Sequence, residues 1–225
     1  MIRRPPRSTR KESSAASDVY KRQEQCDAKN GLLVLGSTGE ALNLSLEARK
    51  QIVEYAIEQN PTSPIMVGVG GHYLQEQIEW VKWLETKNID AYLMVTPIYA
   101  KPGTHGQYEW FKVLMDAVTK PVMLYNVPGR ASMTLSYKTV SMLKDHKNYW
   151  SIKEASGSAE IMQEYLKASG NQAVYCGDDA LLPSFINAGA SGLISVAGNT
   201  WPVETNLYVQ KCLDKSIGDA AGMWK

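Results

Sequence analysis

Residues 91–127 read AYLMVTPIYAKPGTHGQYEWFKVLMDAVTKPVMLYNV, and this stretch decides the fold. It contains two short apolar runs, Ala91–Thr96 and Val122–Val127, with a helical pattern over Tyr108–Val118 between them. The runs are continuously apolar rather than alternating, which is typical of parallel strands covered on both faces. The stretch therefore predicts a strand, a helix and a second, parallel strand.

The same alternation recurs from Gly31 onward, at a spacing of roughly 25–30 residues. The expected strands are Leu32–Gly36, Ile65–Gly68, Ala91–Thr96, Val122–Val127, Trp150–Ala155, Ala173–Cys176 and Gly192–Ala197. The expected helices run from a cap at Ser45 to about Gln59, over Leu74–Leu84 and Tyr108–Val118, and from openings at Ser136, Ala159, Asp179 and Asn199. Seven such units predict an α/β fold, a (β/α)8 TIM barrel that is missing one unit.

An open doubly wound sheet is the alternative that this rhythm leaves. Such a sheet usually carries a glycine-rich dinucleotide loop after its first strand. The only candidate here begins at Gly68, and Tyr73 stands where the fingerprint requires glycine. The barrel is therefore the better interpretation.

The chain divides into three segments. Residues 1–23 are basic and Ser-rich, without an apolar period or the apolar core of a signal peptide, and we expect a non-native, disordered segment there. Residues 24–215 are the expected partial barrel. Residues 216–225 are expected to begin a helical region that is cut short.

Composition excludes several classes of function. The net charge is +1, with 24 basic and 23 acidic residues mixed along the chain, so we expect neither nucleic-acid nor membrane binding. The 3 cysteines lie far apart, which fits a reducing cytosol and a cytoplasmic protein. The 3 histidines are scattered, so we expect no metal site.

Lys153 is the strongest catalytic candidate. It lies in WSIKEASG at residues 150–157, an apolar run closed by small residues, which predicts an inward-pointing side chain near the end of a buried strand. Burial disfavours the ammonium, so such an amine can attack a carbonyl and form a Schiff base. The alternative is a structural lysine that reaches the rim or pairs with Glu154.

Other polar residues follow the expected strands where they end. In a TIM barrel the active site is built at that face. These residues are Ser37, Thr38, Thr96, Tyr99, Tyr125, Asn126, Arg130, Asp178 and Asp179. Of these, the two aspartates are expected to be a helix N-cap pair rather than a catalytic dyad.

Five motifs together closely resemble the dihydrodipicolinate synthase family of pyruvate-dependent class I aldolases, whose superfamily includes N-acetylneuraminate lyase. They are GSTGE at 36–40, TPIY at 96–99, YNVPGR at 125–130, IKEA at 152–155 and GDD at 177–179. The resemblance runs from about Asn30 to the end. It implies a barrel without its first strand and most of its C-terminal helical domain, and a homotetramer when the protein is full length.

The resemblance implies roles for the catalytic candidates. Lys153 would form the imine with pyruvate, so that no further cofactor is needed. Tyr125 and Ser37 would relay protons beside it, and Tyr99 would complete the relay across a subunit interface. Each also has a structural interpretation: Tyr125 as packing, the Ser37 turn as a polar cap, and Tyr99 as a surface aromatic.

The resemblance also implies substrate contacts. Thr38 would bind the pyruvate carboxylate, and Ile194 would supply a backbone carbonyl near the imine. Gly177 would allow close approach of the backbone. Arg130 would hold the carboxylate of the second substrate, although a loop arginine is often only a surface ion pair.

These roles predict a lyase of lysine biosynthesis that condenses pyruvate with L-aspartate 4-semialdehyde. The first alternative is a sister aldolase acting on a sugar-derived aldehyde, because GSTGE is also common in the N-acetylneuraminate lyase branch and such an aldehyde does not need Arg130. The second alternative is an inactive fragment, because a lost strand exposes sheet edges.

Members of this family are often inhibited by lysine at a subunit interface. By motif offset this chain keeps the acid as Glu76 and has His72 where an asparagine is expected. Leu46 and Arg49 replace two histidines, and Ile98 replaces a tyrosine. A guanidinium repels the ammonium of lysine, so we expect weak or absent inhibition.

Overall fold

The computed structural model describes residues 30–59, 62–170 and 172–215, and the segments expected at residues 1–23 and 216–225 lie outside them. In the described part, six parallel strands form one sheet in the order β1-β2-β3-β4-β5-β6. The strands are β1 (Leu32–Val34), β2 (Ile65–Val69), β3 (Ala91–Val95), β4 (Val122–Asn126), β5 (Tyr149–Glu154) and β6 (Ala173–Cys176). This is the predicted TIM barrel in incomplete form.

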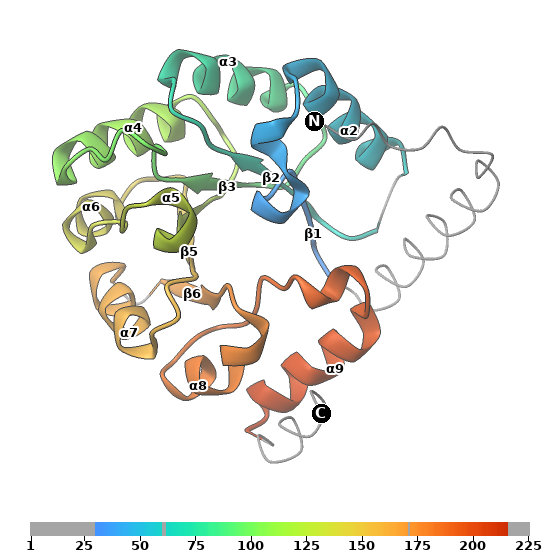
Figure 1. Cartoon of the computed structure of the whole chain (residues 1–225), viewed down its shortest axis with the longest axis vertical. Coiled ribbons are helices and arrows are strands. Elements are labelled where there is room, and N and C mark those ends of the chain that lie inside the picture. Colours follow the sequence, from blue (N-terminus) through green and yellow to red (C-terminus); the bar gives the residue numbers. More distant parts are fainter. Residues whose placement is uncertain (1–29, 60–61, 171, 216–225) are drawn as a thin grey trace, which may run out of the picture.

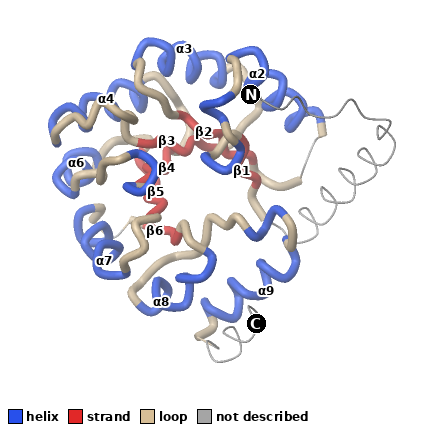
Figure 2. Tube along the Cα trace, in the orientation of Figure 1, coloured by secondary structure: helices blue, strands red, loops and turns tan. Residues whose placement is uncertain are grey.

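Most of the helices lie outside the curved sheet, whereas the short helix α5 lies inside their ring (Figures 1 and 2). They are α2 (Leu46–Glu58), α3 (Leu74–Glu85), α4 (Thr104–Asp116), α5 (Pro128–Ala131), α6 (Tyr137–Leu143), α7 (Ala159–Ala168), α8 (Leu182–Asn187) and α9 (Pro202–Leu213). Short 3-10 turns are η1 (Ser37–Gly39), η2 (Ala41–Asn43), η3 (Asp179–Leu181) and η4 (Ala197–Asn199). The expected cap is confirmed, because Ser45 Oγ accepts a hydrogen bond from Ala48 N at 3.2 Å.

The expected seventh strand, Gly192–Ala197, is wrong. Only Leu193 makes a parallel bridge, to Cys176. The backbone N–H groups of Val196 and Ala197 are turned to the Asp179 carboxylate, so they do not serve a strand ladder. A contact with a distant side chain has replaced strand pairing here.

Two helix starts also differ from the expectation. Asn199 ends η4, and α9 begins at Pro202, where the missing N–H of proline costs nothing. The helix expected from Tyr108 begins at Thr104. Its first turn is stabilised by Gln107, whose Nε2 donates to Pro102 O at 3.2 Å.

Alternate residues of each strand face opposite sides of the sheet. On β3 and β4, Tyr92 and Leu124 belong to the large core under the helices, whereas Leu93 and Tyr125 belong to a smaller cluster inside the barrel. Lys153 is in register with Tyr125, so its side chain also faces the interior. The strand period therefore positions the site.

In the described residues no helix has the length and apolar character needed to cross a bilayer.

Candidate active site

Seven of the eight predicted site residues line one cavity of about 1340 Å³. They are Ser37, Thr38, Tyr125, Arg130, Lys153, Gly177 and Ile194. The cavity reaches from Pro64 and Pro121, at the N-terminal ends of strands, to these residues, which lie near or just beyond the C-terminal ends of the strands. Its walls include both β1 and residues 193–196, which the sheet does not join.

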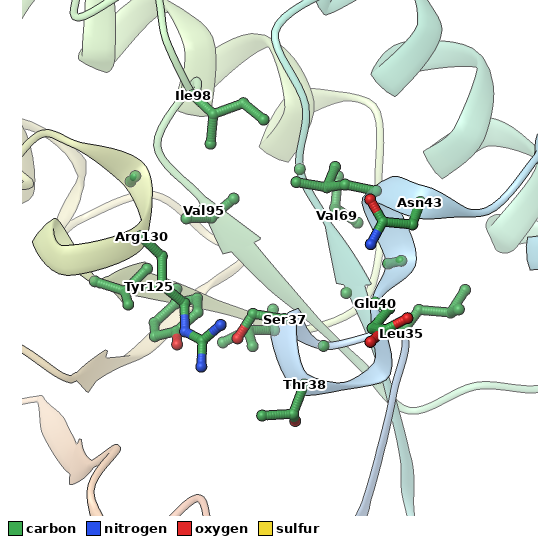
Figure 3. A pocket seen from close by; sticks show the side chains of 18 of the residues that line it. Leu35, Ser37, Thr38, Glu40, Asn43, Val69, Val95, Ile98, Tyr125 and Arg130 are labelled. Carbon is green, nitrogen blue, oxygen red and sulfur yellow. The ribbon is translucent and has the colours of Figure 1, made fainter. Parts of the chain in front are cut away.

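A second pocket of about 510 Å³ adjoins the first and shares four of these residues. Ser37, Tyr125 and Arg130 project into it from three different elements (Figure 3). This pocket is also lined by Arg49 of α2. The pocket therefore connects the shared residues to the helix layer.

Lys153 lies on β5, between two tyrosines of the neighbouring strands. Its register partners are Tyr125 on β4 and Tyr175 on β6. The residue is 6% exposed, and its Nζ lies 4.6 Å from the centroid of the Tyr125 ring. At this distance the ring face attracts a cation, so Tyr125 and Lys153 are in direct electrostatic contact.

Gly177 makes room for the lysine side chain. A Cβ at this position would lie 2.9 Å from Lys153 Cε and 2.8 Å from Ala155 Cβ. Such distances are too short for carbon atoms in contact. Glycine is therefore required by the close approach of β6 to Lys153.

The pKa of Lys153 is lowered to about 8, chiefly because burial disfavours the ammonium. The positive charge of Arg130 lowers the pKa further, while Asp179 and Cys176 raise it. With such a pKa roughly a tenth of the amine is uncharged at pH 7. The side chain can therefore act as a nucleophile near neutral pH.

The alternative pairing of Lys153 with Glu154 is contradicted by the structure. Glu154 is buried on the other face of β5, where its carboxylate accepts from Asn126 Nδ2 at 2.6 Å and from Ser156 N at 2.6 Å. Asn126 Oδ1 in turn accepts from Leu135 N at 2.9 Å. Burial raises the pKa of Glu154, and these hydrogen bonds oppose the rise. Sequence reasoning did not assign this buried bridge between β4 and β5.

The GSTGE motif forms the polar turn that was one of its two interpretations. Gly39 N donates to Gly36 O at 3.0 Å and Glu40 N donates to Ser37 O at 3.2 Å. Glu40 takes a left-handed φ of 53°, which starts η2. Ser37 and Thr38 are left exposed to the cavity, so the turn can also hold a small anion.

Tyr99 is the one predicted site residue that the structure does not bring to the others. It is 91% exposed, and it lines neither of the two pockets. Its φ of 68° is left-handed, which is strained for a tyrosine in the loop between β3 and α4. An interaction with another subunit stays a prediction.

The two aspartates of GDD do different things. Asp178 Oδ1 accepts from Ala180 N at 3.1 Å, which is the expected cap. Asp179 instead accepts hydrogen bonds from Ser195 Oγ and from Val196 N. Sequence spacing could not reveal the second contact, because it joins residues 16 positions apart in a loop.

Arg49 is buried and held by an ion pair. Its Nη2 lies 2.7 Å from Glu76 Oε1, and its guanidinium carbon lies 5.4 Å from the centroid of a Trp80 ring. Of these three residues, Arg49 lines the smaller pocket. Among the residues that the structure describes, no group of three or more His, Cys, Asp or Glu side chains could hold a metal ion.

Comparison with known proteins places this arrangement in a family. Residues 24–221 match the Dihydrodipicolinate synthetase family. The 4-hydroxy-tetrahydrodipicolinate synthase of Francisella philomiragia is 43% identical over 187 residues, which are 83% of this chain and 63% of the relative. The chain thus spans less than two thirds of that relative.

Solved structures share the fold. Dihydrodipicolinate synthase from Aquifex aeolicus has a TM-score of 0.86 and 28% identity, covering 92% of this chain and 72% of that protein. The Acinetobacter baumannii enzyme, complexed with pyruvate, has a TM-score of 0.84 and 33% identity, covering 91% and 71%. The chain belongs to the dihydrodipicolinate synthetase family.

Proposed function

We propose that the protein is a carbon–oxygen lyase that condenses pyruvate with L-aspartate 4-semialdehyde, in cytoplasmic lysine biosynthesis by the diaminopimelate pathway. The observation that carries the proposal is the buried Lys153 amine, with a pKa of about 8, facing a cavity. The names of the relatives and the pyruvate complex of one neighbour support the choice of substrates.

The first step is imine formation. The neutral amine of Lys153 attacks the keto carbon of pyruvate, a C–N bond forms, and the keto oxygen leaves as water after taking up protons. The resulting iminium withdraws electrons, so the adjacent methyl loses a proton and becomes an enamine. The enamine carbon then bonds to the aldehyde carbon of the second substrate, and the aldehyde oxygen takes up a proton to become a hydroxyl. The amine of the second substrate then attacks the iminium carbon and displaces the Lys153 amine, which closes the ring and frees the enzyme.

Tyr125 and Ser37 are the residues that we assign to proton transfer. The Tyr125 ring lies against the amine, 4.6 Å from Nζ to centroid, and both side chains project into the shared pocket. Thr38 and the amides of its turn would bind the pyruvate carboxylate. Ile194 would place its carbonyl at the opposite wall, beside Gly177.

Arg130 is the residue that we assign to the second substrate. It is exposed at the end of the short helix α5 and lines both pockets. A guanidinium there can hold a carboxylate with two hydrogen bonds. L-aspartate 4-semialdehyde carries such a group, whereas a neutral sugar aldehyde does not.

We also propose that the full-length protein is a homotetramer and is insensitive to lysine. The exposed Tyr99 supports an interface at the β3–α4 loop, where it would enter a neighbouring site. The ion pair of Arg49 with Glu76 supports the second proposal, because it occupies the acid that would bind the ammonium of lysine.

The proposal is tested by an assay of pyruvate consumption with two aldehydes, L-aspartate 4-semialdehyde and N-acetylmannosamine. Two proteins are compared: the 225-residue chain and a chimaera extended at both ends with the flanking segments of the Francisella philomiragia relative. We expect the chimaera to prefer the semialdehyde, and Lys153→Ala to be inactive.

The other outcomes separate the alternatives. An active chimaera beside an inactive chain would mean that the chain alone is the inactive fragment. Preference for the sugar aldehyde, unchanged by Arg130→Ala, would establish the sister aldolase. If neither aldehyde were used by either protein, the proposed reaction would be wrong.

A further inference from the structure

One carboxylate fixes the loop that follows β6. Asp179, at the start of η3, accepts hydrogen bonds from Ser195 Oγ, from Val196 N at 3.0 Å and from Ala197 N at 3.4 Å. Ser195 Oγ in turn accepts from Gly198 N at 2.8 Å. The shape of residues 195–198 is therefore set by the Asp179 side chain.

Asp179 is itself fastened to the helix layer. Its backbone carbonyl accepts from Tyr208 Oη on α9 at 2.9 Å. Ile194, one residue before the loop, is tied to β6 by the bond from its N to Cys176 O at 2.8 Å. The carboxylate thus joins η3 and the loop at one wall of the large cavity.

The same carboxylate acts on Lys153 across the cavity. The titratable and charged groups around the amine come from several neighbouring elements. Tyr125 on β4 and Tyr175 on β6 are its register partners, and Arg130 on α5, Asp178 and Asp179 line the same cavity. Cys176 on β6 packs in the outer core and affects the amine only through its charge. Asp179 is the largest influence that favours the ammonium, and Arg130 opposes it. Asp179 therefore offsets part of the cost of burying a cation.

Asp178 provides the contrast. It is exposed and caps η3 through Ala180 N at 3.1 Å, and it is absent from the causes that move the pKa of Lys153. The two adjacent carboxylates therefore differ in their hydrogen-bond partners and in their influence on the pKa of Lys153.

We propose that Asp179 is a positioning residue for the reaction at Lys153. Its carboxylate holds residues 195–197 at the wall of the cavity that Lys153 also lines, and its negative charge favours the positive nitrogen of the ammonium and of the iminium. The part concerning the iminium rests on the proposed function, whereas the part concerning the loop and the amine does not. Asp179 acts by holding the loop and by the electrostatic effect of its charge, and it does not touch the reacting atoms.

Three variants separate charge from hydrogen bonding. Asp179→Asn removes the charge but keeps an acceptor for the loop amides and a donor for Ser195 Oγ. Asp179→Ala removes both functions. Asp178→Asn is the matched control, because it removes the adjacent charge and can keep its cap.

The first measurement is the pH titration of the Lys153 amine, followed by trace labelling with acetic anhydride and mass spectrometry. We expect a midpoint near 8 in the wild type. In Asp179→Asn it should fall by roughly one pH unit, because the stabilising charge is lost. Asp178→Asn should leave the midpoint close to that of the wild type. An equal movement in both variants, or none in Asp179→Asn, would overturn the proposal.

The second measurement is hydrogen exchange of the Val196 and Ala197 amides. Exchange should be at least tenfold faster in Asp179→Ala, equivalent to roughly 1.4 kcal/mol of lost protection, and little changed in Asp179→Asn. Unchanged exchange in Asp179→Ala would refute the loop contact. If Asp179→Ala fails to fold, the labelling of Asp179→Asn still tests the proposal.

Both measurements are made without substrate. A wild-type protein that forms no imine would therefore end the proposed function, but it would leave the role of Asp179 to be judged by the labelling and exchange results. If imine is formed, its pH profile should move with the labelling midpoint in Asp179→Asn and not in Asp178→Asn.

Discussion

The two flanks of Lys153 are held by different means. On the β4 side, strand register and a buried bridge of Asn126 and Glu154 fix the position of the residues. On the β6 side, a loop is fixed mainly by the carboxylate of Asp179, and the expected seventh strand is not formed. The β4 side fixes the position of the Lys153 amine. The β6 side provides the negative charge near the amine and one wall of the cavity.

This difference has an energetic consequence. A buried hydrogen bond to a charged group contributes more than an exposed one, and its loss leaves unsatisfied groups in the core. We therefore expect stability to depend on the β4 side and the chemistry at Lys153 to depend on both sides.

The largest expected effect is on stability. Asn126→Ala would leave both the Glu154 carboxylate and Leu135 N without their buried partner, and should lower the free energy of unfolding by roughly 3 kcal/mol. The control on the β6 side is Asn199→Ala, which loses one exposed hydrogen bond to Val196 O. It should change the free energy of unfolding by less than about 0.5 kcal/mol. Urea denaturation measures both. Equal losses would mean that the two flanks are not different in the proposed way.

The buried Lys153 ammonium should lower the free energy of unfolding. Its pKa is lowered to about 8 in the folded protein and is ordinary when unfolded, so the unfolded chain binds more protons between these two pKa values. Lys153→Met should therefore stabilise the protein by roughly 2–3 kcal/mol at pH 7. The gain should be full below pH 8 and shrink as pH rises toward the unfolded pKa.

The matched control is Lys138→Met, which changes an exposed lysine on α6. It should change stability by less than about 0.5 kcal/mol. Urea denaturation at several pH values compares the two variants. A Lys153→Met protein less stable than the wild type at pH 7 would show that the amine is paired in the core.

A smaller effect is expected where β6 approaches the amine. Gly177→Ala puts a Cβ against Lys153 Cε, and overpacking of this kind costs about 1–3 kcal/mol. Imine formation should slow about tenfold, measured with pyruvate under single-turnover conditions. Gly129→Ala is the control near the same site, because its Cβ would meet no atom within 4 Å. A wild-type rate in Gly177→Ala would mean that the lysine has room to move aside.

The smallest expected effect is that of lysine. Because Arg49 holds Glu76, titration of lysine into the active protein should leave the rate unchanged through the millimolar range. An Arg49→His variant provides the comparison. Half-inhibition of the unaltered protein at sub-millimolar lysine would contradict this expectation.

The sequence predicted the parts of the molecule that depend on local pattern. Continuous apolar runs placed β2 to β6, and the strand period placed Tyr125 and Lys153 on one face. The failures depend on contacts between distant residues. The segment after Gly192 looks apolar enough for a strand, but its amides are bound by Asp179, which no local pattern reveals.

The candidate site followed the same division. The motifs identified the residues that line the cavity, because their positions follow from strand ends. The left-handed backbone at Tyr99 could not be predicted, since a left-handed φ in a tyrosine is not a property of its residue type. The sequence also does not predict the bridge of Glu154 with Asn126, because it joins side chains 28 positions apart on neighbouring strands.

We propose above all that Lys153 forms an imine with pyruvate. Borohydride treatment with pyruvate, followed by peptide mass spectrometry, tests it in the 225-residue chain and in the chimaera. We expect a reduced pyruvyl group on the Lys153 peptide, in amounts that increase as pH rises through about 8, and none in Lys153→Ala. Label on a different lysine, or no label in either protein, would contradict it.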